Sequence, residues 1–130
     1  MIRSRMITAA ALCAALPAGA QDLPSGQSVT LHDSMLEVQA ANNEIWLVLR
    51  YVAPAIQKEA NNALTYADVA KDMDELCLYD GIEAWSRTEA DVAQIMIVLM
   101  DQPVGRGIPN PEVTQFISAY LPTDAGCIWQ

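Results

Sequence analysis

Residues able to do chemistry are few in this sequence, and histidine offers little. His32 is the single histidine, which excludes a histidine-rich metal site, and a Ser–His–Asp arrangement would depend on this one residue. The Gly-x-Ser-x-Gly segment that presents a nucleophilic serine in many hydrolases does not occur. We therefore expect His32 to be a surface or strand-end residue, with a catalytic role as the alternative.

Carboxylates are the only abundant chemical groups. Asp68, Asp72, Asp74 and Glu75 fall close together, and hard cations such as calcium bind clusters of oxygen ligands. Consecutive residues of a helix point in different directions, however, and no EF-hand spacing is present. We predict that these acids form the solvated face of a helix. Asp68, Asp72, Glu75 and the nearby Trp85 then make a candidate interaction surface, and no catalytic residue, metal site or cofactor is predicted.

The first twenty residues have the features of an export signal. Arg3 and Arg5 precede a short apolar run, and small residues follow Pro17 up to Ala20. This pattern predicts a signal peptide over residues 1–20, cleaved between Ala20 and Gln21, and a periplasmic or secreted protein. The apolar run is about half as long as a bilayer span, so a membrane anchor is the weaker alternative, and residues 21–130 should contain no membrane span.

Two cysteines, Cys77 and Cys127, lie outside that signal. An even number of cysteines in an exported chain predicts one disulfide. The alternative is a pair of buried free thiols. No Cys-x-x-Cys motif supports a thiol-exchange activity.

Composition limits the classes of function further. The chain has 130 residues, which is room for one domain, here residues 21–130. That domain carries five Lys or Arg against sixteen Asp or Glu, a net charge of −11. Nucleic-acid binding is excluded because it needs clustered cations. The acidity favours a basic periplasmic or envelope protein as partner; the alternative is that it serves solubility alone.

The pattern of apolar residues predicts an α+β domain. We expect strand structure over 28–32, continuing through 35–39, and a strand over 44–52 that Pro54 ends. Residues 93–100 are apolar on both faces of an extended chain from Ile95 onward, which predicts a central strand covered on both sides.

One main helix should begin at Thr65. Thr65 and Asp68 form the pattern of a capping box, and one helical face carries apolar residues: Val69, Met73, Leu76 and Cys77. Gly81 is the predicted stop, followed by a loop or short helical turn over 82–91.

The C-terminal region permits two interpretations. Residues 110–112 resemble a helix start, and helical spacing continues to Leu121. Alternatively, residues 114–121 form a strand that pairs with 127–129 in a hairpin, which we favour. The three tryptophans, Trp46, Trp85 and Trp129, either form an exposed patch or, as is commoner, pack in the core.

Several segments carry a family resemblance. They are LPSGQSVTL at 23–31, LRYVAPAI at 49–56, the helix ending at Cys77, DQPV at 101–104, PEVTQF at 111–116 and CIW at 127–129. The chain resembles a family of short exported proteins of unknown function from alphaproteobacteria, of the Rhodobacter–Roseobacter group. The resemblance implies no activity.

Together these observations predict an α+β fold, with a small, mostly antiparallel sheet, one main helix packed on it, and one disulfide joining the helix to the C-terminal strand. The favoured function is a non-enzymatic periplasmic binding or accessory protein that acts through protein contacts. The alternatives are a small carboxylate-based hydrolase or calcium- or ligand-binding enzyme, and a structural component of the cell envelope. The sequence leaves the oligomeric state open.

Overall fold

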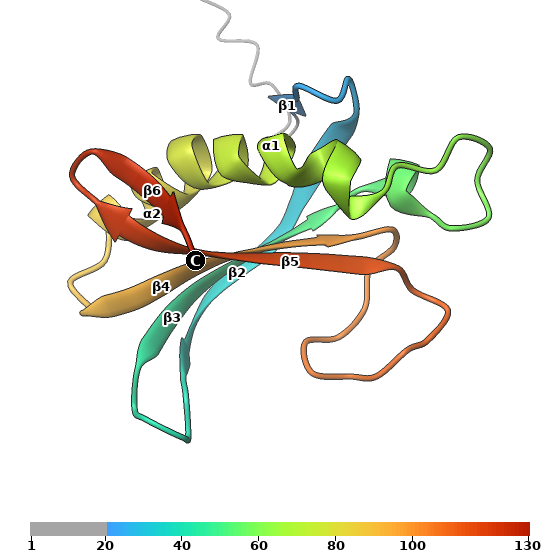
Figure 1. Ribbon diagram of the computed structural model, residues 1–130. Coiled ribbons are helices and arrows are strands. Elements are labelled where there is room, and N and C mark those ends of the chain that lie inside the picture. The colour runs from blue at the N-terminus through green and yellow to red at the C-terminus, as the bar shows by residue number, and fades with distance from the viewer. Residues whose placement is uncertain (1–20) are drawn as a thin grey trace, which may run out of the picture.

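A computed structural model describes residues 21–130 as a six-stranded sheet with a helix on one face (Figure 1). The predicted signal peptide and its cleavage site lie outside these residues or at their boundary. The strands follow in sheet order as β1 (Gln21–Asp22), β2 (Ser28–Val38), β3 (Ile45–Val52), β4 (Val92–Met100), β5 (Gln115–Thr123) and β6 (Gly126–Trp129). The α+β fold class is therefore confirmed.

Helical segments connect β3 to β4. They are the 3₁₀ turn Pro54–Ile56, helix α1 (Tyr66–Leu76), a π-helical turn (Cys77–Gly81) and helix α2 (Ile82–Ser86). This crossover makes β3 and β4 parallel, because a parallel pair needs a long connection. All other neighbouring strands are antiparallel. Across residues 21–130, none of the helices has the length and apolar character that a membrane crossing requires.

The main core lies between the sheet and α1. Alternate residues of the central strands point toward the helix, including Leu49 and Tyr51 of β3 and Ile95 and Ile97 of β4, and all four are buried. The other face of β3 and β4 holds a second small cluster built on Val48 and Val98. Strand β4 is thus covered on both sides, as its sequence predicts.

The predicted apolar face of α1 is confirmed. Thr65 and Asp68 form a reciprocal capping box at its first turn, and Val69, Met73 and Leu76 are completely buried. The helix does not end at Gly81, so that prediction is wrong: Gly81 has helical dihedral angles and the chain continues into α2. Gly81 serves packing instead, since a Cβ there would lie 3.1 Å from Ile95 Cγ2.

The C-terminal hairpin and the disulfide are also confirmed. Strands β5 and β6 pair through a tight turn, with Pro122 opposite Cys127. Cys127 is bonded to the fully buried Cys77, fifty residues earlier in the chain. The bond therefore fastens the end of α1 to the edge strand β6.

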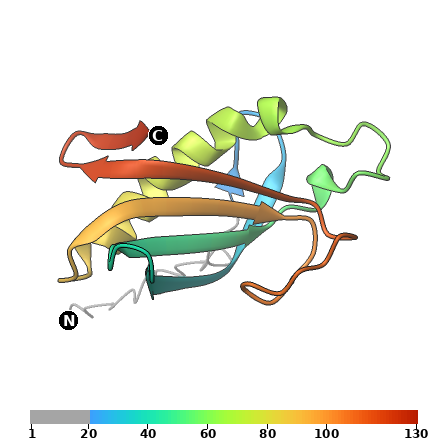
Figure 2. The ribbon, with the colours of Figure 1, turned by 60° about the horizontal axis from the view of Figure 1, so that its bottom comes forward.

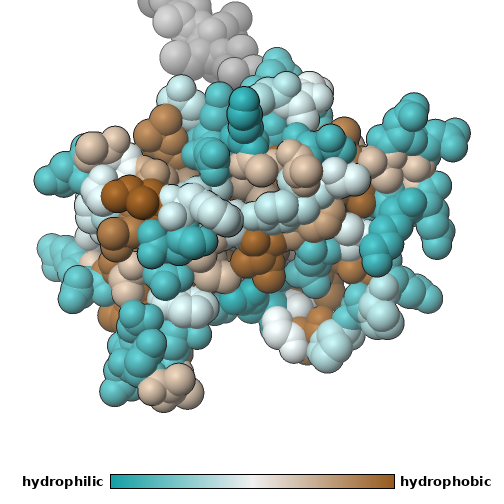
Figure 3. Space-filling model, viewed as in Figure 1, coloured by the Kyte–Doolittle hydropathy of each residue, from teal (hydrophilic) through white to brown (hydrophobic). Residues whose placement is uncertain are grey.

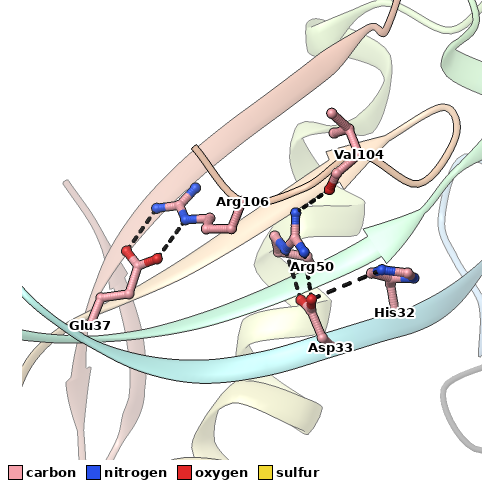
Figure 4. A network of polar contacts seen from close by, with 6 residues as sticks. All are labelled: His32, Asp33, Glu37, Arg50, Val104 and Arg106. Atoms are coloured by element: carbon pink, nitrogen blue, oxygen red, sulfur yellow. Dashed lines mark hydrogen bonds and ion pairs between the residues drawn. The ribbon is translucent and has the colours of Figure 1, made fainter. Parts of the chain in front are cut away.

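The loop between β4 and β5 lies on the side of the sheet opposite α1 (Figures 1 and 2). Two arginines attach it there (Figure 4). The buried Arg50 of β3 donates to the Val104 carbonyl at 2.6 Å and to Asp33 of β2 at 2.7 Å. Arg106 of the loop donates to both carboxylate oxygens of Glu37, at 2.6 and 2.9 Å.

Candidate interaction surface

The four residues predicted to form an interaction surface lie in different environments. Asp68 is exposed and caps the start of α1. Trp85 of α2 is half-buried and packs against the main core. Glu75 lines a groove beside the C-terminal hairpin. Asp72 is fully buried. The structure therefore does not bring these four side chains together.

Asp72 does not lie on the solvated face of the helix, and that prediction is wrong. The segment before β2 covers it: Ser25 donates its backbone N–H at 2.9 Å and its hydroxyl at 2.5 Å, and Gln27 Nε2 donates at 2.7 Å. These three hydrogen bonds compensate the carboxylate for its loss of water. Asp72 therefore attaches the start of the described chain to α1.

The polar cluster around Arg50 joins β2, β3 and the loop between β4 and β5. His32 Nε2 lies 4.0 Å from Asp33 Oδ2, but that carboxylate is already bound by Arg50 (Figure 4). The hydrogen bond from Arg50 lowers the pKa of Asp33, and the one from Arg106 lowers the pKa of Glu37. The Asp33 carboxyl is held as an anion by Arg50 of β3, and the Glu37 carboxyl by Arg106 of the loop between β4 and β5. Within residues 21–130, no group of three or more His, Cys, Asp or Glu side chains is placed to hold a metal ion.

A groove between α1 and β6 is lined by both aromatic and acidic side chains, and we call it the α1–β6 groove. Figures 1 and 2 both show β6 beside α1. The groove consists of two adjoining hollows of about 340 and 330 Å³, which share Asp74 and Trp129. Its other main wall residues are Tyr66, Ala70, Glu75 and Leu78, and its floor is formed by Ser118 and Tyr120 of β5.

Trp129 is held in an exposed position by its indole nitrogen. Its Nε1–H donates to Ser118 Oγ at 3.3 Å, although 65% of the residue surface remains accessible. The same Ser118 hydroxyl is hydrogen-bonded to the Tyr66 hydroxyl at 2.8 Å. Tyr66 is further fixed by an edge-on contact with Phe116, with ring centroids 5.8 Å apart. Two aromatic side chains from the two walls are thus anchored on one floor residue.

Carboxylates give the groove a negative charge. Tyr120 donates its hydroxyl to Asp74 Oδ1 at 2.7 Å. Burial, together with this carboxylate, raises the pKa of Tyr120, so the phenol remains a neutral donor. No Lys or Arg lines either hollow, and neither Asp74 nor Glu75 forms an ion pair with another residue of the 21–130 range.

Two of the three tryptophans pack against core clusters, and the third is exposed. Trp46 packs against the Val48 cluster and Trp85 against the main core, as the commoner interpretation predicts. Trp129 is exposed instead. Sequence reasoning did not find its combination with Tyr66 and Asp74, because these residues are far apart in the chain.

The rest of the surface in this view lacks a broad apolar area. In Figure 3, hydrophobic residues occur in small groups separated by hydrophilic ones. The α1–β6 groove combines an exposed indole with two carboxylates that form no ion pair within residues 21–130. This arrangement is suited to binding, since aromatic faces and carboxylates recognise cationic and partly apolar groups.

Comparison with known proteins places the chain in a family. The chain belongs to a family of unknown function, DUF6497, which matches residues 6–130. No curated protein and no solved structure matches the chain.

Proposed function

We propose that this chain is an exported, non-enzymatic accessory protein that binds a partner protein through the α1–β6 groove. The observation that carries the proposal is Trp129, which is fixed by Ser118 yet 65% exposed. Leaving a large aromatic side chain in water is unfavourable, and tryptophan is enriched at the centres of protein interfaces. A partner that covers Trp129 would remove this surface from water.

Export is supported by two independent features. The N-terminal pattern of two arginines, an apolar run and small residues is typical of a signal peptide. Disulfides such as Cys77–Cys127 are typical of oxidising compartments and are rare in the cytosol. The resemblance to exported alphaproteobacterial proteins agrees with a periplasmic or secreted location.

Site-directed photocrosslinking tests the binding function. A benzophenone amino acid replaces Leu78, which is exposed and lines the groove, in protein expressed in its own bacterium. Illumination should produce one defined protein adduct, and that adduct should be lost when Trp129→Ala is added. The matched control carries the same probe at Ile108, which is 60% exposed in the loop between β4 and β5.

Two results would refute the proposal. If position 78 gives no adduct, or the same adducts as position 108, the groove is not a protein-binding surface. Intact mass of the recovered protein tests export in the same experiment: a chain that begins at Gln21 supports it, and an uncleaved chain contradicts it.

A further inference from the structure

We propose that the α1–β6 groove binds the side chain of an arginine or lysine of its partner, with the cationic group between the Trp129 indole and the carboxylates of Asp74 and Glu75. This inference rests on the proposed function and adds the chemistry of recognition. It is carried by the aromatic walls, the unpaired carboxylates and the shape of the groove.

The aromatic walls suit a cation. Trp129 is 65% exposed and Tyr66 is 37% exposed, and both are hydrogen-bonded to the same Ser118 hydroxyl. Because the rings are already held in place, little side-chain freedom is lost when a ligand binds. Indole is the aromatic group that attracts cations most strongly.

The carboxylates supply the opposite charge. Asp74 is used only in part, since Tyr120 donates to its Oδ1. Glu75 has no ion-pair partner within residues 21–130, and Lys71 on the same helix pairs with neither acid. Within residues 21–130, arginines lie within ion-pair distance of Asp33, Glu37 and Glu83, and neither acid of the groove is among these. The groove therefore presents negative charge that the fold leaves uncompensated.

The shape fits a long side chain better than a small ion. The two hollows meet at Asp74 and Trp129. The small Ala70 lines one hollow and the exposed Leu78 lines the other. An alkyl stem can lie along such apolar groups while its cationic end reaches a carboxylate. The net charge of −11 over residues 21–130 also attracts a basic partner at long range.

Peptide binding followed by NMR tests the inference. The probes are a blocked pentapeptide with a central arginine and the same peptide with citrulline, which has nearly the same shape but no charge. The readout is the indole N–H resonance of Trp129, identified by its absence in the Trp129→Phe variant. The arginine peptide should shift this resonance in a saturable way, with at least about fivefold higher affinity than the citrulline peptide.

Variants assign the contributions. Trp129→Ala, read from the backbone amides of α1, should weaken binding of the arginine peptide about tenfold. The double variant Asp74→Asn/Glu75→Gln removes the two charges and should also weaken binding and reduce its dependence on salt. Asn is chosen because its amide oxygen can still accept the hydrogen bond from Tyr120. Glu112→Gln removes a charge from an exposed loop residue outside the groove and should leave the affinity within about twofold.

The outcomes separate this inference from the proposed function. If the arginine and citrulline peptides bind equally, or if neither binds, the cationic recognition is wrong. A Trp129-dependent protein adduct in the photocrosslinking experiment would then still support a protein-binding groove with different chemistry. Equal weakening per charge removed, in Glu112→Gln and in the double variant, would mean that only net charge matters, which also overturns the inference.

Discussion

Breaking the Cys77–Cys127 bond should cost a large part of the stability of this domain. The bond closes a loop of fifty residues between α1 and β6. On the chain-entropy account, a loop of this length stabilises the folded state by about 4 kcal/mol, because the unfolded chain loses freedom. Domains of this size have a total stability of about 5–15 kcal/mol, so reduction should remove between about a quarter and four fifths of it.

Urea denaturation of oxidised and chemically reduced wild-type protein measures this effect. Reduction keeps both sulfur atoms, so the comparison isolates the loop constraint from packing. With a urea slope of about 2 kcal/mol per molar for a small domain, the midpoint should fall by about 2 M.

Single variants then separate the bond from the packing around it. Cys77→Ala and Cys127→Ala both break the same disulfide, but Cys77 is completely buried and Cys127 is half-buried. Cys77→Ala should therefore be less stable than Cys127→Ala, by about 1 kcal/mol for the lost core contacts. Coincident urea curves for oxidised and reduced wild type would refute the reasoning from loop closure.

Other side chains give separate predictions. Asp72→Ala leaves the donors of Ser25 and Gln27 without an acceptor and should lower the free energy of unfolding by about 3 kcal/mol. Asp68→Ala, which removes an exposed helix cap, should lower it clearly less. Equal losses in urea denaturation would contradict the burial argument. The folded state lowers the pKa values of Asp33 and Glu37, so their pairing stabilises the protein above the unfolded carboxyl pKa values and is lost as the pH falls through the lower folded ones. The urea midpoint should therefore fall between about pH 5 and pH 3, and this fall should be flatter in Asp33→Asn/Glu37→Gln; an unchanged slope would show that other groups cause it. Gly81→Ala places a methyl group 3.1 Å from a core isoleucine and should lower the free energy of unfolding by about 1 kcal/mol, which a lower melting temperature would show. An unchanged melting temperature would mean that the isoleucine moves aside.

The start of the described chain is tied to the helix by tertiary contacts alone. Asp72 takes hydrogen bonds from Ser25 and Gln27, which lie more than forty residues earlier. Strand β1 contributes only two residue pairs with β2. The side chain of Asp72 is therefore the main polar attachment of this segment, and its loss should free the segment before it affects the sheet.

Local sequence determined most of the secondary structure. The capping box at Thr65, the apolar face of α1, the alternation in β2 and the continuous apolar run of β4 depend on residues within a few positions of one another, and each is present in the structure. The disulfide was also predictable, because two cysteines lie outside the predicted signal peptide and they have one pairing available. These features follow from periodicity and counting, which need no knowledge of distant contacts.

Tertiary structure alone decided the environment of individual side chains. Asp72 has the sequence context of an exposed helix acid but is buried, because a segment distant in sequence folds over it. Gly81 has the context of a helix stop but has helical dihedral angles, and its lack of a side chain leaves room for Ile95 of β4. The α1–β6 groove exists because the β5–β6 hairpin, fastened by Cys127, lies beside α1 and places Trp129 near Asp74. Helical periodicity can place Asp74 on a face of α1, but only the packing of the hairpin decides which aromatic residue lies next to it.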